Sequence, residues 1–173
     1  MKAVVIQGSA RSLGNTRQLI GYLKSKFQFD IIDLKDYTIN HYDYTFKNQK
    51  DDFKPLVAHI IKNYDLLIFA TPIYWYSMSG IMKVFFDRIS DLLTLDKALA
   101  RTLNNKHFAV ISCGSDCEVK KGFYMPFIES ANYLDMHYQA STHGWIEDGK
   151  IAIAAKQNLD KFANQLVLKL DLT

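Results

Sequence analysis

Five short runs of aliphatic and β-branched residues alternate along the chain with five longer segments whose apolar residues recur at helical spacing. The first run, residues 3–6, is apolar throughout, as expected of a strand buried on both faces of a sheet. Strict alternation of strand and helix predicts a doubly wound α/β fold, with a five-stranded parallel sheet and helices on both faces. The expected strands are residues 3–6, 29–34, 65–70, 107–112 and 138–143, and the expected helices are residues 16–27, 51–63, 80–92, 124–134 and 157–170.

In such folds, ligands bind beyond the carboxyl ends of the strands, so we expect the chemistry in the loops after the first, third and fourth strands.

A length of 173 residues predicts a single domain over residues 1–173. The net charge is only +3 and no run of Lys or Arg exceeds two residues, which argues against nucleic acid as a partner. No stretch approaches the roughly 20 apolar residues of a membrane span. The two cysteines form no disulfide framework, which favours a cytoplasmic location.

The first loop, residues 8–16, reads Gly-Ser-Ala-Arg-Ser-Leu-Gly-Asn-Thr, and a helix is expected directly behind it. Free backbone N–H groups and the helix dipole attract anions to such a position. The loop also holds several side-chain donors and a glycine that permits close approach of the backbone. These residues are Ser9, Arg11, Ser12, Gly14, Asn15 and Thr16. The loop is therefore expected to bind a phosphate group.

Other phosphate-binding motifs fit this loop poorly. A Walker A motif has Lys before its Ser or Thr, whereas Asn15 stands there in this chain and the glycine spacing is one residue longer. The dinucleotide fingerprint Gly-x-Gly-x-x-Gly is absent. No cysteine follows the first strand, as a cysteine-dependent phosphatase would require, and the strand ends lack the acidic residues of a phospho-receiver domain. Nucleoside triphosphates are thereby disfavoured as ligands.

The second loop, residues 71–80, carries three consecutive aromatic residues at the end of a buried strand. Turns usually contain Gly, Pro, Asn, Asp or Ser at such positions, so the aromatic run is unusual. Pro72 stiffens the turn, and backbone groups of residues 73–78 could hydrogen-bond the edge of an isoalloxazine ring. The positive end of the following helix, near Ser79, would favour negative charge on that ring when reduced. The loop therefore indicates a flat ring attached to the phosphate.

The third loop follows the fourth strand and contains the only two cysteines, Cys113 and Cys117. Gly114 would permit close approach of the backbone to a ligand. Two thiols are too few for an iron–sulfur cluster, so we expect Cys113 and Cys117 to be ordinary thiols of the loop. A regulatory disulfide between them is the alternative. The five histidines are scattered without metal-ligand spacing, and no metal site is predicted. His143 ends the fifth strand, at the edge where a substrate contact is possible, but a structural role is favoured.

Residues 8–16 and 71–88 together resemble the NAD(P)H-dependent FMN reductase branch of the flavodoxin-like superfamily, and the order of elements matches along nearly the whole chain. The resemblance implies a flavodoxin-like sheet of order 2-1-3-4-5 and bound FMN as cofactor. It also implies two-electron reductase activity and a homodimer, or a tetramer, with flavin near the interface. Lys83, Asp87 and Arg88 match the family pattern too, but their helical spacing favours ordinary salt bridges.

The resemblance assigns cofactor-binding roles to residues in all three loops. Phosphate contacts are expected from Ser9, Arg11, Gly14, Asn15 and Thr16. Ring contacts are expected from Pro72, Ile73, Tyr74, Trp75, Tyr76, Ser77 and Met78. Contacts to the other side of the ring or to the ribityl chain are expected from Ser112, Cys113 and Gly114. No side chain is assigned a catalytic role, because hydride transfer from reduced nicotinamide to flavin needs no acid or base.

The favoured function is therefore an FMN-dependent oxidoreductase that takes electrons from NADH or NADPH. A quinone, a nitro- or azo-aromatic or free flavin would be the small-molecule acceptor. An electron-carrier flavodoxin is the first alternative, although such carriers are usually strongly acidic. A non-enzymatic flavin-binding sensor or scaffold is the second, because a fold does not determine a function. The Tyr-rich residues 36–48 are expected to form a long loop, which could shape a substrate mouth or a dimer contact.

Overall fold

We describe residues 1–172 in a computed structural model. The protein consists of a seven-stranded sheet with helices on both faces. None of the helices in this range is long and apolar enough to cross a membrane. The strands are β1 Ala3–Gln7, β2 Asp30–Asp33, β3 Leu66–Tyr74, β4 Ser77–Met78, β5 His107–Gly114, β6 His137–Glu147 and β7 Lys150–Ile151. The helices are α1 Asn15–Leu23, α2 Phe53–Asn63, α3 Gly80–Leu95, α4 Lys97–Arg101, α5 Met125–Tyr133 and α6 Ile153–Leu170, with a 3-10 turn, η1, at Leu34–Asp36.

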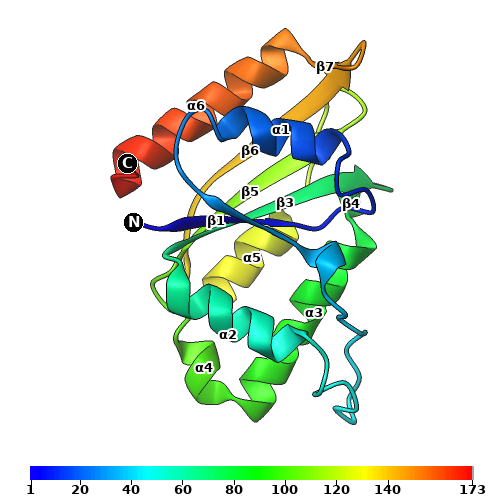
Figure 1. The fold of residues 1–173 in the computed structure, drawn as a ribbon, viewed down its shortest axis with the longest axis vertical. Helices are drawn as coiled ribbons and strands as arrows, with labels where there is room; N and C mark the ends of the chain where they lie inside the picture. Colours follow the sequence, from blue (N-terminus) through cyan, green and yellow to red (C-terminus); the bar gives the residue numbers. More distant parts are fainter. Residues whose placement is uncertain (173) are drawn as a thin grey trace.

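Five parallel strands in the order β2-β1-β3-β5-β6 make up most of the sheet. This order is the 2-1-3-4-5 arrangement expected of a flavodoxin-like fold, and it is confirmed. Two short antiparallel strands, β4 and β7, extend it by pairing with the ends of β3 and β6. Because all five parallel strands run the same way, the loops that follow β1, β3 and β5 meet at one edge (Figure 1).

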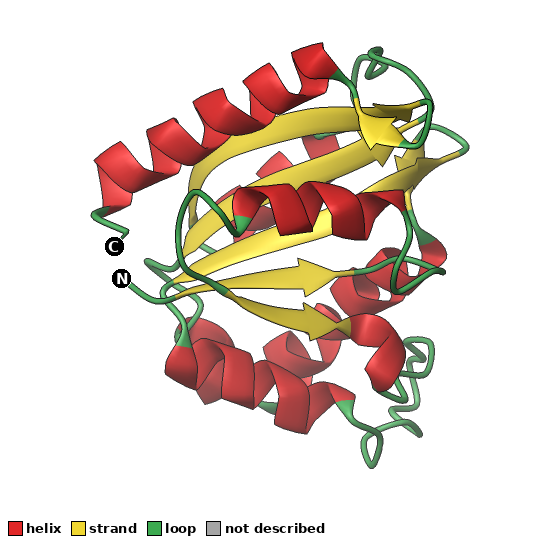
Figure 2. Ribbon diagram, turned by 45° about the horizontal axis from the view of Figure 1, so that its top comes forward, coloured by secondary structure: helices red, strands yellow, loops and turns green. Residues whose placement is uncertain are grey.

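Alternation of side chains along the strands divides the core into two layers. Val4 and Ile6 of β1 face α2, α3 and α5, whereas Val5 faces α1 and α6. Figure 2 shows the sheet between these two groups of helices. Central strands that are covered on both faces must be apolar at every position, which explains the continuous aliphatic runs in the sequence.

Several boundaries differ from the sequence-based expectation. Residues 71–79 were expected as a loop, but β3 continues to Tyr74 and turns back through β4 as a hairpin. The fourth and fifth parallel strands are also longer than expected, since β5 reaches Gly114 and β6 reaches Glu147. Helix α1 ends at Leu23, and α6 begins at Ile153. Pairing with neighbouring strands extends β3, β5 and β6, and local sequence does not report such pairing.

Arg88 on α3 holds the long segment between β2 and α2 in place. The residue is 1% exposed, and all five of its side-chain N–H donors have acceptors. Two donate to the Asp51 carboxylate, one to Asp91 at 2.6 Å, and one each to the carbonyls of Asn40 and Asn48. The sequence suggested ordinary salt bridges here, and Arg88 does pair with Asp51 and Asp91. Burial of the guanidinium instead makes Arg88 the internal support of residues 40–51.

Replacing Arg88 with Met would leave the carboxylates of Asp51 and Asp91 buried without a cation. We expect R88M to lower the free energy of unfolding by about 3–5 kcal/mol, measured by urea titration. K83M on the same helix is the matched control, because Lys83 pairs with Asp87 on the surface at 2.5 Å and should cost less than about 1 kcal/mol. Equal losses in the two variants would contradict the role assigned to Arg88.

Candidate functional site

The first loop passes from β1 directly into the N-terminus of α1. Gly14 is the N-cap residue, and within the described chain no side chain caps the helix. The first N–H groups of α1 therefore point to the loop without a capping side chain, as an anion-binding turn requires. Ser9 and Thr16 are buried beside it, whereas Arg11 is exposed at its rim. Asn15 is the first residue of the helix.

A buried glutamine that sequence reasoning missed supports this loop from beneath. Gln7, the last residue of β1, donates from Nε2 to the Ser12 carbonyl at 3.0 Å and to Asp33 at 2.8 Å. From η1, which follows β2, the Lys35 ammonium donates to the Ala10 carbonyl at 3.2 Å. A Gln at the carboxyl end of an otherwise apolar strand was a signal for such support, but one of its two acceptors, Asp33, lies on another strand.

Direct contacts join the first loop to the start of α3. The Ser79 hydroxyl donates to the Gly8 carbonyl at 2.6 Å, and its oxygen accepts from the Met82 N–H as the N-cap of α3. A Cβ at Gly8 would lie 2.9 Å from the Met82 Cβ and 3.1 Å from its Cα. Only glycine therefore allows α3 to approach the first loop this closely. Thr71 completes the link, because its Oγ1 accepts from the Ser79 N–H at 3.0 Å.

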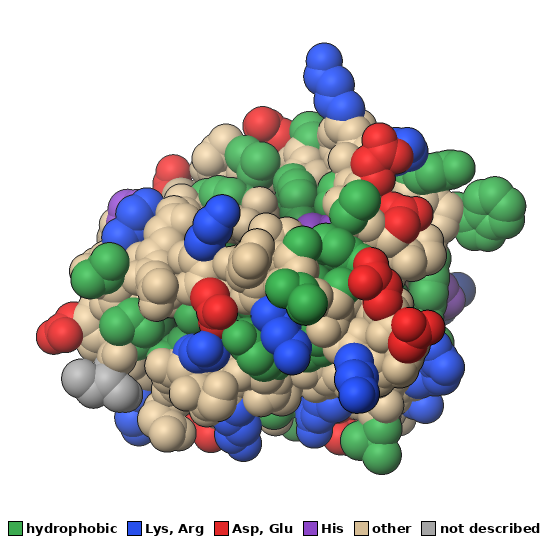
Figure 3. Space-filling view, turned by 90° about the horizontal axis from the view of Figure 1, so that it is seen from above, with side chains coloured by type: hydrophobic (Ala, Val, Ile, Leu, Met, Phe, Trp, Pro, Cys, Tyr) green, Lys and Arg blue, Asp and Glu red, His purple; other side chains and the backbone are tan. Residues whose placement is uncertain are grey.

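The second loop is the β3–β4 hairpin, whose tip consists of aromatic residues. Trp75 and Tyr76 have φ angles of +48° and +65°, in the left-handed region that costs a non-glycine residue roughly 1–2 kcal/mol. Their exposed fractions are 93% and 67%, while Pro72 and Met78 at the hairpin base are buried. Figure 3 shows large hydrophobic side chains protruding at one end of the molecule. Strain of this kind concentrates at binding sites.

A cavity of about 260 Å³ lies between the hairpin and the third loop. The hairpin contributes Ile73 and Tyr76 to its lining. The opposite wall comes from the third loop, with Gly114, Ser115, Asp116, Glu118, Lys120 and Phe123. Backbone, aromatic and charged groups thus surround a space at the carboxyl edge of the sheet, where a planar group could be held between two walls.

Ser112 and Cys113 were both expected to contact the cofactor, but alternation along β5 sends their side chains to opposite faces of the sheet. The Cys113 thiol is buried in the layer beneath α1 and α6, against the Thr16 hydroxyl, and burial raises its pKa to about 11. The Ser112 hydroxyl points to the other face and is within 2.7 Å of the Tyr124 hydroxyl. The exposed thiol of the pair is that of Cys117.

The structure therefore gathers most of the predicted residues around two adjoining features. Hydrogen-bond donors that could bind a phosphate surround the N-terminus of α1, and the hairpin and third loop enclose the cavity. The arrangement fits the two ends of FMN, since one feature suits an anion and the other a flat ring. Two predicted residues, Ser112 and Cys113, have side chains engaged within the protein, and Ser77 and Tyr74 are exposed on the hairpin.

Comparison with known proteins agrees with this geometry. The family model described as NADPH-dependent FMN reductase matches residues 1–119. A Bacillus subtilis (strain 168) protein named as an NAD(P)H-dependent FMN-containing oxidoreductase, YwqN, is 32% identical over 154 residues, covering 84% of this chain and 83% of its own. An NADPH azoreductase from Bacillus sp. (strain OY1-2) is 28% identical over 100 residues, covering 58% of this chain and 56% of its own.

Among solved structures, the Trp repressor binding protein from Bacillus subtilis superposes with a TM-score of 0.75 at 27% identity. The match covers 95% of this chain and 97% of that one. The family match in turn includes both the loop at α1 and the β3–β4 hairpin. By sequence, fold and site, this chain belongs to the NADPH-dependent FMN reductase family.

Proposed function

We propose that this protein is an FMN-dependent NAD(P)H oxidoreductase that passes electrons from reduced nicotinamide to a small acceptor. A quinone, a nitro- or azo-aromatic compound or free flavin fits the acceptor role. Residues 1–173 would act as one flavin-binding domain in the cytoplasm. Membership of the reductase family supports the activity, and the name of the azoreductase relative supports an azo compound among the acceptors.

One observation carries the proposal: the Ser79–Gly8 bond and the Gly8–Met82 contact hold the anion-binding turn beside the aromatic hairpin. A phosphate and a flat ring on the same molecule would engage both at once. Bound FMN would supply the hydride and electron chemistry, because its ring accepts a hydride and later gives the electrons up. The chain itself contributes binding, orientation and electrostatics.

Each loop has a distinct task in this scheme. Ser9, Asn15, Thr16 and the N–H groups of α1 would hold the phosphate, and Arg11 would close over it from the rim. Backbone groups of residues 72–78 would hydrogen-bond the ring edge. The N-terminus of α3, capped by Ser79, presents its positive dipole end behind the hairpin and would stabilise negative charge on a reduced ring.

Anaerobic reduction tests the oxidoreductase assignment. The protein loaded with FMN should lose its visible absorbance when NADH or NADPH is added, and should regain it when a quinone or azo dye follows. Chemical reduction by dithionite is the control that the flavin is accessible. An electron carrier would be reduced by dithionite but not by either nucleotide, and a chain that does not take up FMN would overturn the proposal.

Substitutions in the first loop test the phosphate position. R11A removes a charge-assisted contact and should weaken FMN binding about tenfold or more, measured by flavin fluorescence. T16V should weaken it further by removing a hydroxyl while keeping side-chain volume, whereas T16S should bind close to wild type. R101A on α4 serves as the matched control for loss of an arginine. Unchanged affinity in R11A and T16V together would show that the phosphate lies elsewhere.

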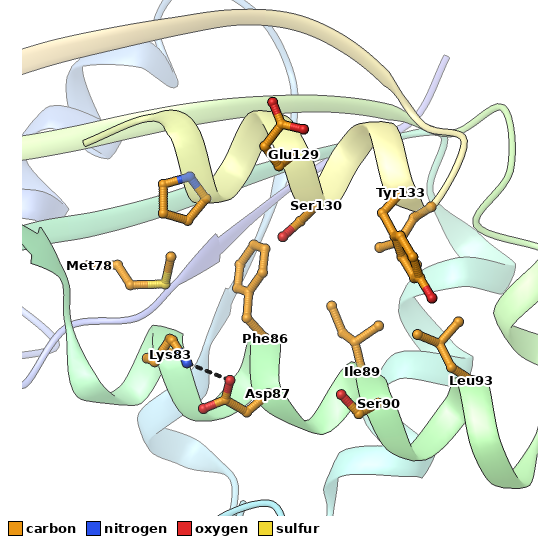
Figure 4. A pocket seen from close by; sticks show the side chains of 12 residues that line it. Met78, Lys83, Phe86, Asp87, Ile89, Ser90, Leu93, Glu129, Ser130 and Tyr133 are labelled. Atoms are coloured by element: carbon orange, nitrogen blue, oxygen red, sulfur yellow. Dashed lines mark hydrogen bonds and ion pairs between the residues drawn. The ribbon is translucent and has the colours of Figure 1, made fainter. Parts of the chain in front are cut away.

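We also propose a homodimer, formed through the groove between α3 and α5. This groove has a volume of about 500 Å³ and a mainly apolar lining, including Phe86, Ile89 and Leu93 from α3. Figure 4 shows Tyr133 of α5 facing Leu93 across one end, and the Lys83–Asp87 pair on the rim. Glu129 adds another rim charge, so the surface carries both signs and can pair with a second copy of itself.

A charge placed in this groove should break the dimer. Y133E changes a side chain that is 77% exposed, so the monomer should fold normally while the mass in solution, measured by multi-angle light scattering, falls to that of one chain. L168E, on α6 at the opposite face and 85% exposed, should keep the mass of two chains. Dissociation in both variants, or in neither, would contradict an interface at α3 and α5.

A further inference from the structure

A buried cluster of polar side chains lies beneath the third loop and was not explained by sequence reasoning. Ser112 of β5 and His143 of β6 are register partners, and the Ser112 hydroxyl lies 2.8 Å from the His143 Nδ1. The hydroxyl of Tyr124, just before α5, lies 2.7 Å from Ser112 and 3.0 Å from the Thr142 carbonyl. On the other side of its ring, His143 Nε2 lies 2.9 Å from the backbone carbonyl of Asp116.

The partners of His143 determine where its proton resides. A carbonyl oxygen can only accept, so Nε2 carries the hydrogen and donates it to Asp116. Nδ1 is then the acceptor, and the Ser112 hydroxyl donates to it. Burial lowers the pKa of His143, and the neutral ring is the form that this pattern requires. Both ring nitrogens are therefore satisfied at neutral pH.

Packing fixes the orientation of the ring as well as its tautomer. A Cβ at Gly114 would lie 2.8 Å from the His143 Cε1, so glycine is needed where the third loop crosses the ring. The ring also stacks on Trp145, with centroids 6.0 Å apart and planes inclined by 20°. His143 is thus held rigidly by the sheet, with its Nε2–H aimed at the loop.

The bond from His143 reaches the exposed part of the third loop. Residues 115–118 are exposed, and within the described chain the side-chain bonds of Asp116 and Glu118 stay inside the loop, to Ser115, the Glu118 N–H and Lys120. The donation from His143 to the Asp116 carbonyl instead comes from the sheet. Gly114, Ser115, Asp116 and Glu118 form one wall of the 260 Å³ cavity.

We propose that His143 is the positioning residue of the third loop: its Nε2–H holds the Asp116 carbonyl and so sets the wall against which the flavin ring rests. His143 itself touches no ligand in this scheme. The proposal deepens the proposed function and rests on it for the identity of the ring. The loop anchoring can be measured without any ligand.

Two substitutions separate the Nε2 bond from the rest of the cluster. H143Q places an amide nitrogen near the position of Nε2 and keeps a donor for Asp116, whereas H143N reaches only as far as Nδ1 and loses it. Limited trypsin digestion of the full chain without FMN, followed by mass spectrometry, reports opening of the loop at Lys120 and Lys121. Cleavage at Lys50, in the segment held by Arg88, is the internal reference, and urea titration records global stability.

We expect loop cleavage relative to Lys50 to rise roughly fivefold in H143N, as the loss of one hydrogen bond predicts, and to stay near wild type in H143Q. With FMN bound, H143N should also change the visible circular dichroism of the flavin and weaken FMN affinity, and H143Q should restore both. Wild-type cleavage in H143N, or equal effects in the two variants, would overturn the proposal. Failure of the wild type to bind FMN would instead sink the proposed function, and the digestion without FMN would still decide the role of His143.

Discussion

The close approach of α3 to the first loop is the constraint on which the rest of the site depends. Gly8 lacks a side chain where Met82 packs, and Ser79 uses the resulting proximity to bond the Gly8 carbonyl. The anion-binding turn and the aromatic hairpin are thereby parts of one rigid unit. Any side chain at Gly8 would push α3 away and separate the two ends of the site, although neither α1 nor the sheet would need to change.

Around this unit, three surface segments are each held in place by one buried polar side chain. Gln7 supports the first loop, His143 the third, and Arg88 the long segment before α2. Buried polar groups are costly unless every partner is in place, so these supports impose one conformation on loops that are otherwise exposed. A site that binds a rigid planar cofactor gains from such preorganisation, because little ordering remains to be done on binding.

Much of this could be predicted from the sequence. The five parallel strands and, through the family resemblance, their order are confirmed, and the strands follow from the hydrophobic period. The phosphate-binding role of the loop at α1 rests on a dense local cluster of donors and stays a prediction. The hairpin at residues 73–78 was expected as a loop, and the supports Gln7 and Ser79 were missed. Their partners lie on other strands and helices, beyond the reach of any local pattern.

The sequence by itself determined the alternating α/β architecture and the chemistry of each loop, because period, turn residues and donor content are local properties. Only the tertiary structure decided which side chains face the site. The pleat of β5 turned Ser112 and Cys113 to opposite faces, and pairing of β5 with β6 brought His143 under the third loop. Strand register is a long-range property, and a shift of one residue reverses every side chain along a strand.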